Sequence, residues 1–182
     1  MFKPFSMTLG ALLLTAGAAL AENPMVGGAA MYDNRTIVEN AVNSADHTTL
    51  VAAVKAAGLV ETLSGPGPFT VFAPTNAAFE KLPAGTVETL LKPENKDKLT
   101  QILTCHVVAA EAMSAAIDKM IADDGGAHPV KTVGGCEFTA MKSGDAIQIK
   151  DGQGNVANVT IADVKQSNGV IHVIDTVLLP AN

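Results

Sequence analysis

The fold is decided by residues 67–79, whose sequence is GPFTVFAPTNAAF. Glycine and proline open the stretch as a turn, and the aromatic and β-branched residues from Phe69 to Ala73 predict a β-strand. Pro74 ends the strand, because proline cannot donate to a sheet ladder. Thr75 is then placed to cap a short helix over the remaining residues. The stretch therefore predicts a strand that runs directly into a helix.

Helical patterns come first along the chain and strand patterns come last. Thr36 and Glu39 form a capping box that predicts a helix start, and Pro83 and Pro93 mark two further helix starts. Apolar residues at helical spacing over 113–121 predict a longer helix. From about residue 127 short β-type runs alternate with turns, and these runs cover residues 130–133, 136–141, 146–150, 156–164 and 169–179. This order predicts an α+β protein with a largely antiparallel sheet.

The first 21 residues have the features of a secretory signal peptide. Lys3 is positively charged, residues 9–20 are mainly apolar, and Ala19-Leu20-Ala21 is a cleavage site of the usual small-residue type. The apolar run is too short to cross a bilayer, which needs about 20 residues. We expect cleavage before Glu22, a lead segment over residues 22–33 and a single domain over residues 34–182. The protein is then expected in the periplasm or outside the cell, without membrane insertion after cleavage.

The composition of the expected exported chain excludes some classes of partner. The chain would have 161 residues, enough for one domain with its own core. It would carry 11 basic and 18 acidic residues, a net charge of −7, which disfavours nucleic acid as a partner. Its four Phe, one Tyr and no Trp also offer few surfaces on which single-stranded bases could stack.

The exported chain would hold two cysteines, Cys105 and Cys136. An even pair in an oxidising compartment favours a disulfide. The alternative is two buried free thiols.

Motifs that carry chemistry are missing from the sequence. There is no nucleophile elbow, no zinc-protease motif, no paired cysteine motif and no phosphate-binding loop. Residues 151–155 resemble a calcium loop but lack its alternating acidic ligands. His172 lies in a strand that is apolar on both faces, so a buried structural histidine is expected rather than a ligand. Asp175 would point to the opposite face of that strand, so the two residues are not expected to form a proton relay.

Two long segments resemble the signatures of the fasciclin domain family. The first is residues 67–79, and the second is residues 167–180, SNGVIHVIDTVLLP. Residues 103–108, LTCHVV, resemble the segment between them. The order and spacing of these segments also fit the family, and the resemblance covers residue 34 to the end. Residues 25–31 and the following helix resemble the lead of single-domain secreted bacterial members.

The resemblance implies a wedge of mostly antiparallel β-strands packed with a layer of short helices. It also implies adhesion or matrix binding, with no catalytic, cofactor-binding or metal-binding residues. The family-motif residues, expected to be structural, are Phe69, Thr75, Asn76, His106, Asn168, Gly169, His172 and Asp175. Many members carry tyrosine before the central histidine, in a segment tied to integrin binding in animal members. Cys105 stands at that position here, so that activity is not expected.

Three functions follow from the sequence, in order of preference. The first is a secreted non-enzymatic binding module whose partner is a cell-surface or matrix macromolecule, either protein or polysaccharide. The second is a carrier of a small apolar ligand held between helices and sheet. The third is a hydrolase or metalloenzyme whose site assembles only in three dimensions.

Overall fold

The computed structural model describes residues 23–181, so the expected signal peptide and its cleavage point lie outside the described residues. The helices are α1 (Ile37–Ala41), η1 (Ala45–His47), α2 (Thr48–Ala57), α3 (Val60–Ser64), α4 (Asn76–Glu80), α5 (Thr86–Leu90), η2 (Pro93–Asn95), α6 (Lys96–Cys105) and α7 (Ser114–Asp123). The strands are β1 (Met25–Val26), β2 (Ala29–Ala30), β3 (Phe69–Pro74), β4 (Val107–Val108), β5 (Ala127–Lys131), β6 (Glu137–Ser143), β7 (Ala146–Lys150), β8 (Val156–Gln166) and β9 (Gly169–Ile174). None of the helices in residues 23–181 is both long and apolar enough to cross a membrane.

Seven strands form one sheet in the order β4-β3-β9-β8-β7-β6-β5. Every neighbouring pair is antiparallel except β3 and β9, which run parallel from the Phe69–Gly169 pair to the Pro74–Ile174 pair. The two signature segments therefore lie side by side in the sheet, although they are far apart in the sequence. The predicted α+β class with a largely antiparallel sheet is confirmed.

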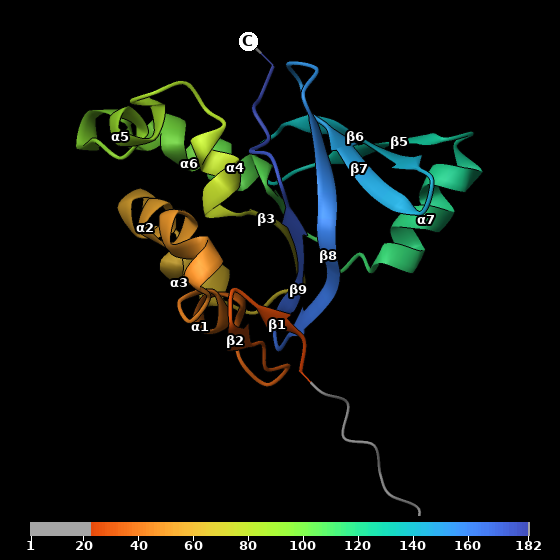
Figure 1. Ribbon diagram of the computed structural model, residues 1–182, viewed down its shortest axis with the longest axis horizontal. Helices are drawn as coiled ribbons and strands as arrows, with labels where there is room; N and C mark the ends of the chain where they lie inside the picture. Colours follow the sequence, from red (N-terminus) through yellow and green to blue (C-terminus); the bar gives the residue numbers. More distant parts are fainter. Residues whose placement is uncertain (1–22, 182) are drawn as a thin grey trace, which may run out of the picture.

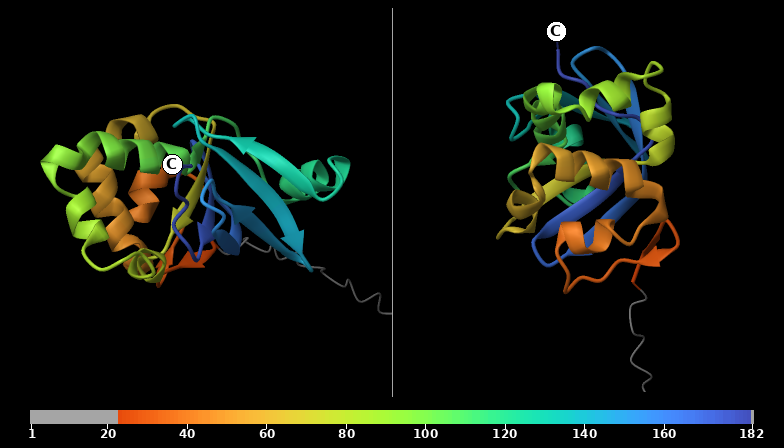
Figure 2. Two further views of the ribbon diagram at one scale, coloured as in Figure 1. Left: turned by 90° about the horizontal axis from the view of Figure 1, so that it is seen from above. Right: turned by 90° about the vertical axis from the view of Figure 1, so that its left-hand side faces the viewer.

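The helices and strands form a wedge around strands β3 and β9. Helices α1 to α6 lie on one side of these strands, and β5 to β7 with α7 lie on the other (Figures 1 and 2). Each side has its own apolar core. The buried sheet residues of the helical core are Val71, Ala73, Val107, Val164, Ile171 and Val173. The sheet residues of the second core are Phe72, Phe138, Ala140, Ile147, Ile149, Ala157 and Ile174. Strand β9 is thus apolar on both faces because it separates two cores.

Local signals placed most of the helix starts correctly. Thr36 and Glu39 form the predicted capping box of α1, and Thr75 caps α4 by accepting the Ala78 N–H. Pro83 was a wrong helix start, because α5 begins only at Thr86, after a glycine in the left-handed conformation.

The predicted last strand was too long. Strand β9 ends at Ile174, and residues 175–179 continue outside the sheet. On the β3 side they have no strand partner, because β3 ends at the Pro74–Ile174 pair, and on the β8 side the Asp175 N–H still donates to the Asn158 carbonyl.

Two glycines allow the signature segments to approach each other. A Cβ atom on Gly67 would lie 1.9 Å from the Asn168 carbonyl oxygen, and one on Gly169 would lie 2.0 Å from the Phe69 carbonyl oxygen. Any side chain at either position would push β3 and β9 apart. The glycines are therefore a condition of the parallel pairing.

The lead segment docks on the helical layer. Val26 and Met31 are buried in the helical core. The fully buried Asn40 side chain accepts the Tyr32 N–H and donates to the Tyr32 carbonyl, so α1 holds the segment by its backbone.

Candidate functional site

The side chain of Asn168 joins three separate parts of the chain. It accepts the Ile37 N–H at 3.0 Å and donates to the carbonyls of Leu63 and Gly65 at 2.7 and 2.9 Å. The Asn168 carbonyl also accepts the Phe69 N–H at 3.1 Å. Asn168 thus connects α1, the end of α3 and the start of β3, which fits its predicted structural role.

His106 connects the end of α6 to the C-terminal segment. Its Nδ1–H donates to the Ile102 carbonyl at 2.8 Å, and its Nε2 accepts the Leu178 N–H at 2.9 Å. The Asp151 carboxylate accepts the next backbone donor, the Leu179 N–H, at 2.9 Å. Because Leu178 is an N–H donor, the ring of His106 must be neutral and protonated on Nδ1. Burial lowers the pKa of His106 to about 4, against the opposing effects of the Ile102 carbonyl and the Asp151 charge.

We expect the free energy of unfolding to fall as the pH is lowered from about 6.5 to about 4. The unfolded chain binds a proton at His106 near pH 6.5, whereas the folded ring stays neutral until about pH 4. The unfolded state therefore binds more protons in this window, and the loss from this group reaches about 3 kcal/mol. Urea unfolding at several pH values measures it. His106→Gln, which does not titrate, should lose less on acidification, and an equal loss in both proteins would refute the assignment to His106.

His172 ties the sheet to the segment before α7. Its Nε2–H donates to the Ala112 carbonyl at 2.7 Å, and its Nδ1 accepts the Asp163 N–H at 3.3 Å. The ring stacks on Phe72 with centroids 5.8 Å apart. Burial lowers the pKa of His172, although the Ala112 carbonyl and the Asp163 charge partly oppose this. The ring is therefore neutral at pH 7 and is protonated on Nε2.

Replacing His172 with alanine should lower the free energy of unfolding by about 1–4 kcal/mol, because hydrogen bonds and packing are both lost. His128→Ala is the control. The His128 ring bonds the exposed carboxylate of Asp124, a kind of pair that contributes about 1 kcal/mol or less. Thermal melts with metal analysis compare the variants. An unchanged melting temperature together with loss of bound zinc would instead assign His172 to a metal site.

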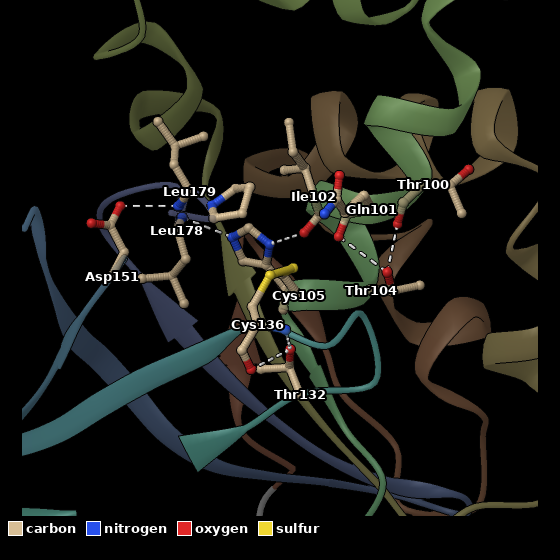
Figure 3. Close-up of a disulfide and its surroundings, with 12 residues drawn as sticks. Thr100, Gln101, Ile102, Thr104, Cys105, Thr132, Cys136, Asp151, Leu178 and Leu179 are labelled. Carbon is tan, nitrogen blue, oxygen red and sulfur yellow. Dashed lines mark hydrogen bonds between the residues drawn. A yellow bond between two sulfur atoms is a disulfide. The ribbon is translucent and has the colours of Figure 1, made fainter. Parts of the chain in front are cut away.

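The structure contains the predicted disulfide between Cys105 and Cys136 (Figure 3). The two Cα atoms are 5.4 Å apart, within the range that a disulfide needs. The bond joins the end of α6 to the turn before β6. In that turn the Gly134 N–H donates to the Thr104 carbonyl at 3.1 Å, so the turn also packs on α6 through its backbone.

The remaining motif residues also bond to the fold itself. Asn76 accepts the Thr49 N–H at 3.0 Å and donates to the Ala45 carbonyl at 2.9 Å, which joins α4 to α2. Asp175 accepts the backbone and side-chain N–H groups of Asn158 at 2.8 and 2.9 Å. Burial acts to raise the pKa of Asp175, but these hydrogen bonds outweigh it and the pKa lies below its ordinary value. Asp175 and His172 bond different partners and form no relay.

Ser114, Asp163 and His172 come together, but not as a catalytic triad. Both the N–H and the hydroxyl of Ser114 donate to the Asp163 carboxylate. The two ring nitrogens of His172 already bond backbone groups, so neither can take a proton from the serine. Across residues 23–181 no three side chains of His, Cys, Asp and Glu gather closely enough to hold a metal ion.

The calcium-like residues 151–155 form a turn organised by Asp151. Its carboxylate accepts the N–H groups of Gln153, Asn155 and Leu179, and the side-chain amide of Asn155 as well. The Asp151 carboxylate therefore accepts four N–H groups of the protein itself, which hold the turn and the C-terminal segment together.

An apolar cavity of about 50 Å³ lies in the helical core. Most of its lining residues belong to β3, α1, α2 and α3, and others come from α6, β4, β8 and β9. Its polar lining residues are Ser44, His47, Lys55 and His106. Ser44 and His47 are buried, and their side chains hydrogen-bond each other through the Ser44 hydroxyl and Nδ1 of His47 at 2.9 Å.

The sequence did not predict the structural role of six residues whose side-chain hydrogen bonds support the motif residues or the cavity lining. They are Asn40, Ser44, His47, Thr70, Asp151 and Asp163. The turn composition around Asp151 was a usable signal, because Asp bonds backbone N–H groups in such turns. The Thr70 hydroxyl donates to the Ala110 carbonyl and accepts the Ala112 N–H, and no local sequence pattern predicts these contacts between distant residues.

Comparison with known proteins places the chain in a family. The family model described as Fasciclin domain matches residues 45–180. The chain is 46% identical over 180 residues to Protein sll1483 of Synechocystis, covering 97% of this chain and 91% of that protein. It is 36% identical over 166 residues to the cell surface glycolipoprotein MPB83 of Mycobacterium bovis, covering 88% of this chain and 68% of the relative.

The fold is also that of a solved structure. That structure is a FAS1 domain pair from the insect cell adhesion molecule Fasciclin I, with a TM-score of 0.67 and 20% sequence identity. The match covers 80% of this chain and 51% of the insect chain. The predicted family is therefore confirmed, and the chain belongs to the fasciclin domain family.

Proposed function

We propose that the protein is an exported, non-enzymatic module that binds a macromolecule of the cell surface or matrix. One observation carries the proposal: the polar atoms of Asn168, His106 and His172 all bond the protein's own backbone. The motif residues therefore build the domain, which leaves partner binding to the surface. The name of the mycobacterial relative as a cell surface protein supports this placement, as does the expected signal peptide.

The open face of strands β6 and β7 is the candidate surface. Side chains alternate along these strands, so that Phe138 and Ile149 are buried while Thr139, Met141 and Gln148 face outward and are partly exposed. Gln148 pairs with Met141 on the neighbouring strand, so it lies diagonally across from Thr139, two residues away in the register. A face that presents partly exposed polar groups suits contact with a protein or a polysaccharide.

Retention on the envelope fraction of the host tests the proposal. Immobilised protein should retain a component of that fraction, and the double variant Thr139→Arg/Gln148→Arg should lose retention by tenfold or more. The matched control is Thr89→Arg/Gln101→Arg, which makes the same substitutions on exposed residues of the helical layer. Absence of retention would contradict the proposal. Equal loss in both variants would contradict the assignment to this face.

A second candidate function, carriage of a small apolar ligand, is favoured by the cavity in the helical core. Native mass spectrometry of the purified protein tests it directly. A carrier releases a bound small molecule on denaturation.

A further inference from the structure

The sequence contains a single asparagine that is followed by glycine, the Asn168–Gly169 pair at the point where the β8–β9 turn enters β9. Asparagine deamidates most readily before glycine, because glycine has no side chain to shield its backbone nitrogen. That nitrogen attacks the side-chain carbonyl carbon of asparagine, ammonia leaves and a cyclic imide forms. Water then opens the imide to aspartate or isoaspartate. The net reaction consumes water, releases ammonia and exchanges an amide for a carboxylate.

The fold opposes the first step of this reaction by fixing the Asn168 side chain. Its oxygen accepts the Ile37 N–H, and its nitrogen, which would leave as ammonia, donates to the carbonyls of Leu63 and Gly65. Asn168 and Gly169 are also both buried. Attack by the Gly169 nitrogen makes the side-chain carbonyl carbon tetrahedral and draws it toward the backbone. Ring closure therefore pulls the amide away from all of these partners.

The backbone of the pair is held in the sheet as well. Gly169 pairs with Gln166 on β8 and with Phe69 on β3, and the Asn168 carbonyl accepts the Phe69 N–H at 3.1 Å. The imide ring would include the Asn168 carbonyl carbon and the Gly169 nitrogen, so its formation needs both backbone groups to move. Deamidation at this position therefore requires that the surrounding sheet first opens, locally or by global unfolding.

The acidic products no longer fit the site. A carboxylate accepts hydrogen bonds but donates none, so the carbonyls of Leu63 and Gly65 would lose their donor and face a buried negative charge. Isoaspartate also adds a methylene group to the backbone beside Gly169, where a Cβ atom would already lie 2.0 Å from the Phe69 carbonyl oxygen. A chain that has reacted at this position is therefore hindered from restoring the pairing of β3 with β9.

We propose that Asn168 is a deamidation site that the folded domain keeps closed and that unfolding opens. Deamidation there marks a molecule that has stayed unfolded. It also removes that molecule from the folded population, because the product lacks the native contacts of the amide. The site depends only on the fold, so it is independent of the partner that the surface binds.

A second asparagine–glycine pair in the same molecule provides the matched control. Asp124→Asn places asparagine before Gly125 in the turn after α7, where both residues are exposed. The oxidised variant is incubated at pH 8, either folded or unfolded in guanidinium chloride, and peptide mass spectrometry follows deamidation at each position. We expect position 168 to react about tenfold faster or more in the unfolded chain, because its hydrogen bonds must break in the folded one. Position 124 should react at comparable rates in both samples.

Dilution of the denaturant tests the consequence of the reaction. Molecules deamidated at position 168 should be depleted from the refolded fraction that size-exclusion chromatography separates, whereas molecules deamidated at position 124 should enter it. Equal rates at position 168 in the folded and unfolded samples would refute protection by the fold. Full refolding of molecules that carry aspartate or isoaspartate at position 168 would refute their removal from the folded population.

Discussion

Removal of the Cys105–Cys136 disulfide is expected to lower the free energy of unfolding by about 3–4 kcal/mol. The bond closes a loop with a sequence separation of 31 residues. Without it the unfolded chain gains the entropy of that loop, while the folded state keeps most of its contacts. The folded state is retained because the turn before β6 packs on α6 through its own backbone hydrogen bonds, including that of Gly134 with Thr104.

Urea unfolding of Cys105→Ala/Cys136→Ala beside the oxidised wild type measures this loss. Added reductant should destabilise the wild type toward the variant and should leave the variant unchanged. A variant as stable as the oxidised wild type would show that the disulfide does not stabilise the fold. Thiol titration of the exported, unfolded protein should find no free thiol.

Asn168→Ala is expected to cost about 3–5 kcal/mol, the largest effect of any single substitution proposed for this protein. The variant leaves the carbonyls of Leu63 and Gly65 and the N–H of Ile37 without their partner in a buried site. Each unpaired buried group costs about 1–3 kcal/mol, less where water can reach it.

Gln166 offers a matched control on the same side of the sheet. It is a buried amide like Asn168, with exposed fractions of 7% and 8%, but its side-chain amide makes no hydrogen bond to the described residues. Gln166→Ala should therefore cost about 1 kcal/mol or less, since no hydrogen bond to the protein is lost. Chemical denaturation of both variants measures the two losses in the free energy of unfolding. Similar losses would mean that packing, and not the hydrogen bonds of Asn168, explains the effect.

Local chemistry explains which elements could be predicted from the sequence. The caps at Thr36 and Thr75 were predictable because each hydroxyl bonds an N–H three residues away. Strand β7 was predicted at its observed bounds, since turns border it on both sides. The apolar character of both faces of β9 predicted a buried histidine at position 172, and the ring is fully buried.

Contacts between distant segments explain what could not be predicted. No pattern near His106 indicates that its partner is the backbone of Leu178, 72 positions away. The parallel pairing of β3 with β9 likewise depends on the close approach of two glycine-containing segments, Gly67 and Gly169.

The tautomers of His106 and His172 test most directly the claim that the motif histidines hold backbone and perform no chemistry. Imidazole ¹⁵N–¹H correlation spectra at pH 7 should show that both rings are neutral and that they are different tautomers. His106 should be protonated on Nδ1 and His172 on Nε2, because Ile102 and Ala112 present carbonyl acceptors to these atoms. His106 should remain neutral at pH 5.5, above its pKa of about 4. A charged ring at pH 7, or rapid exchange between tautomers, would contradict the claim and would make these residues available for chemistry.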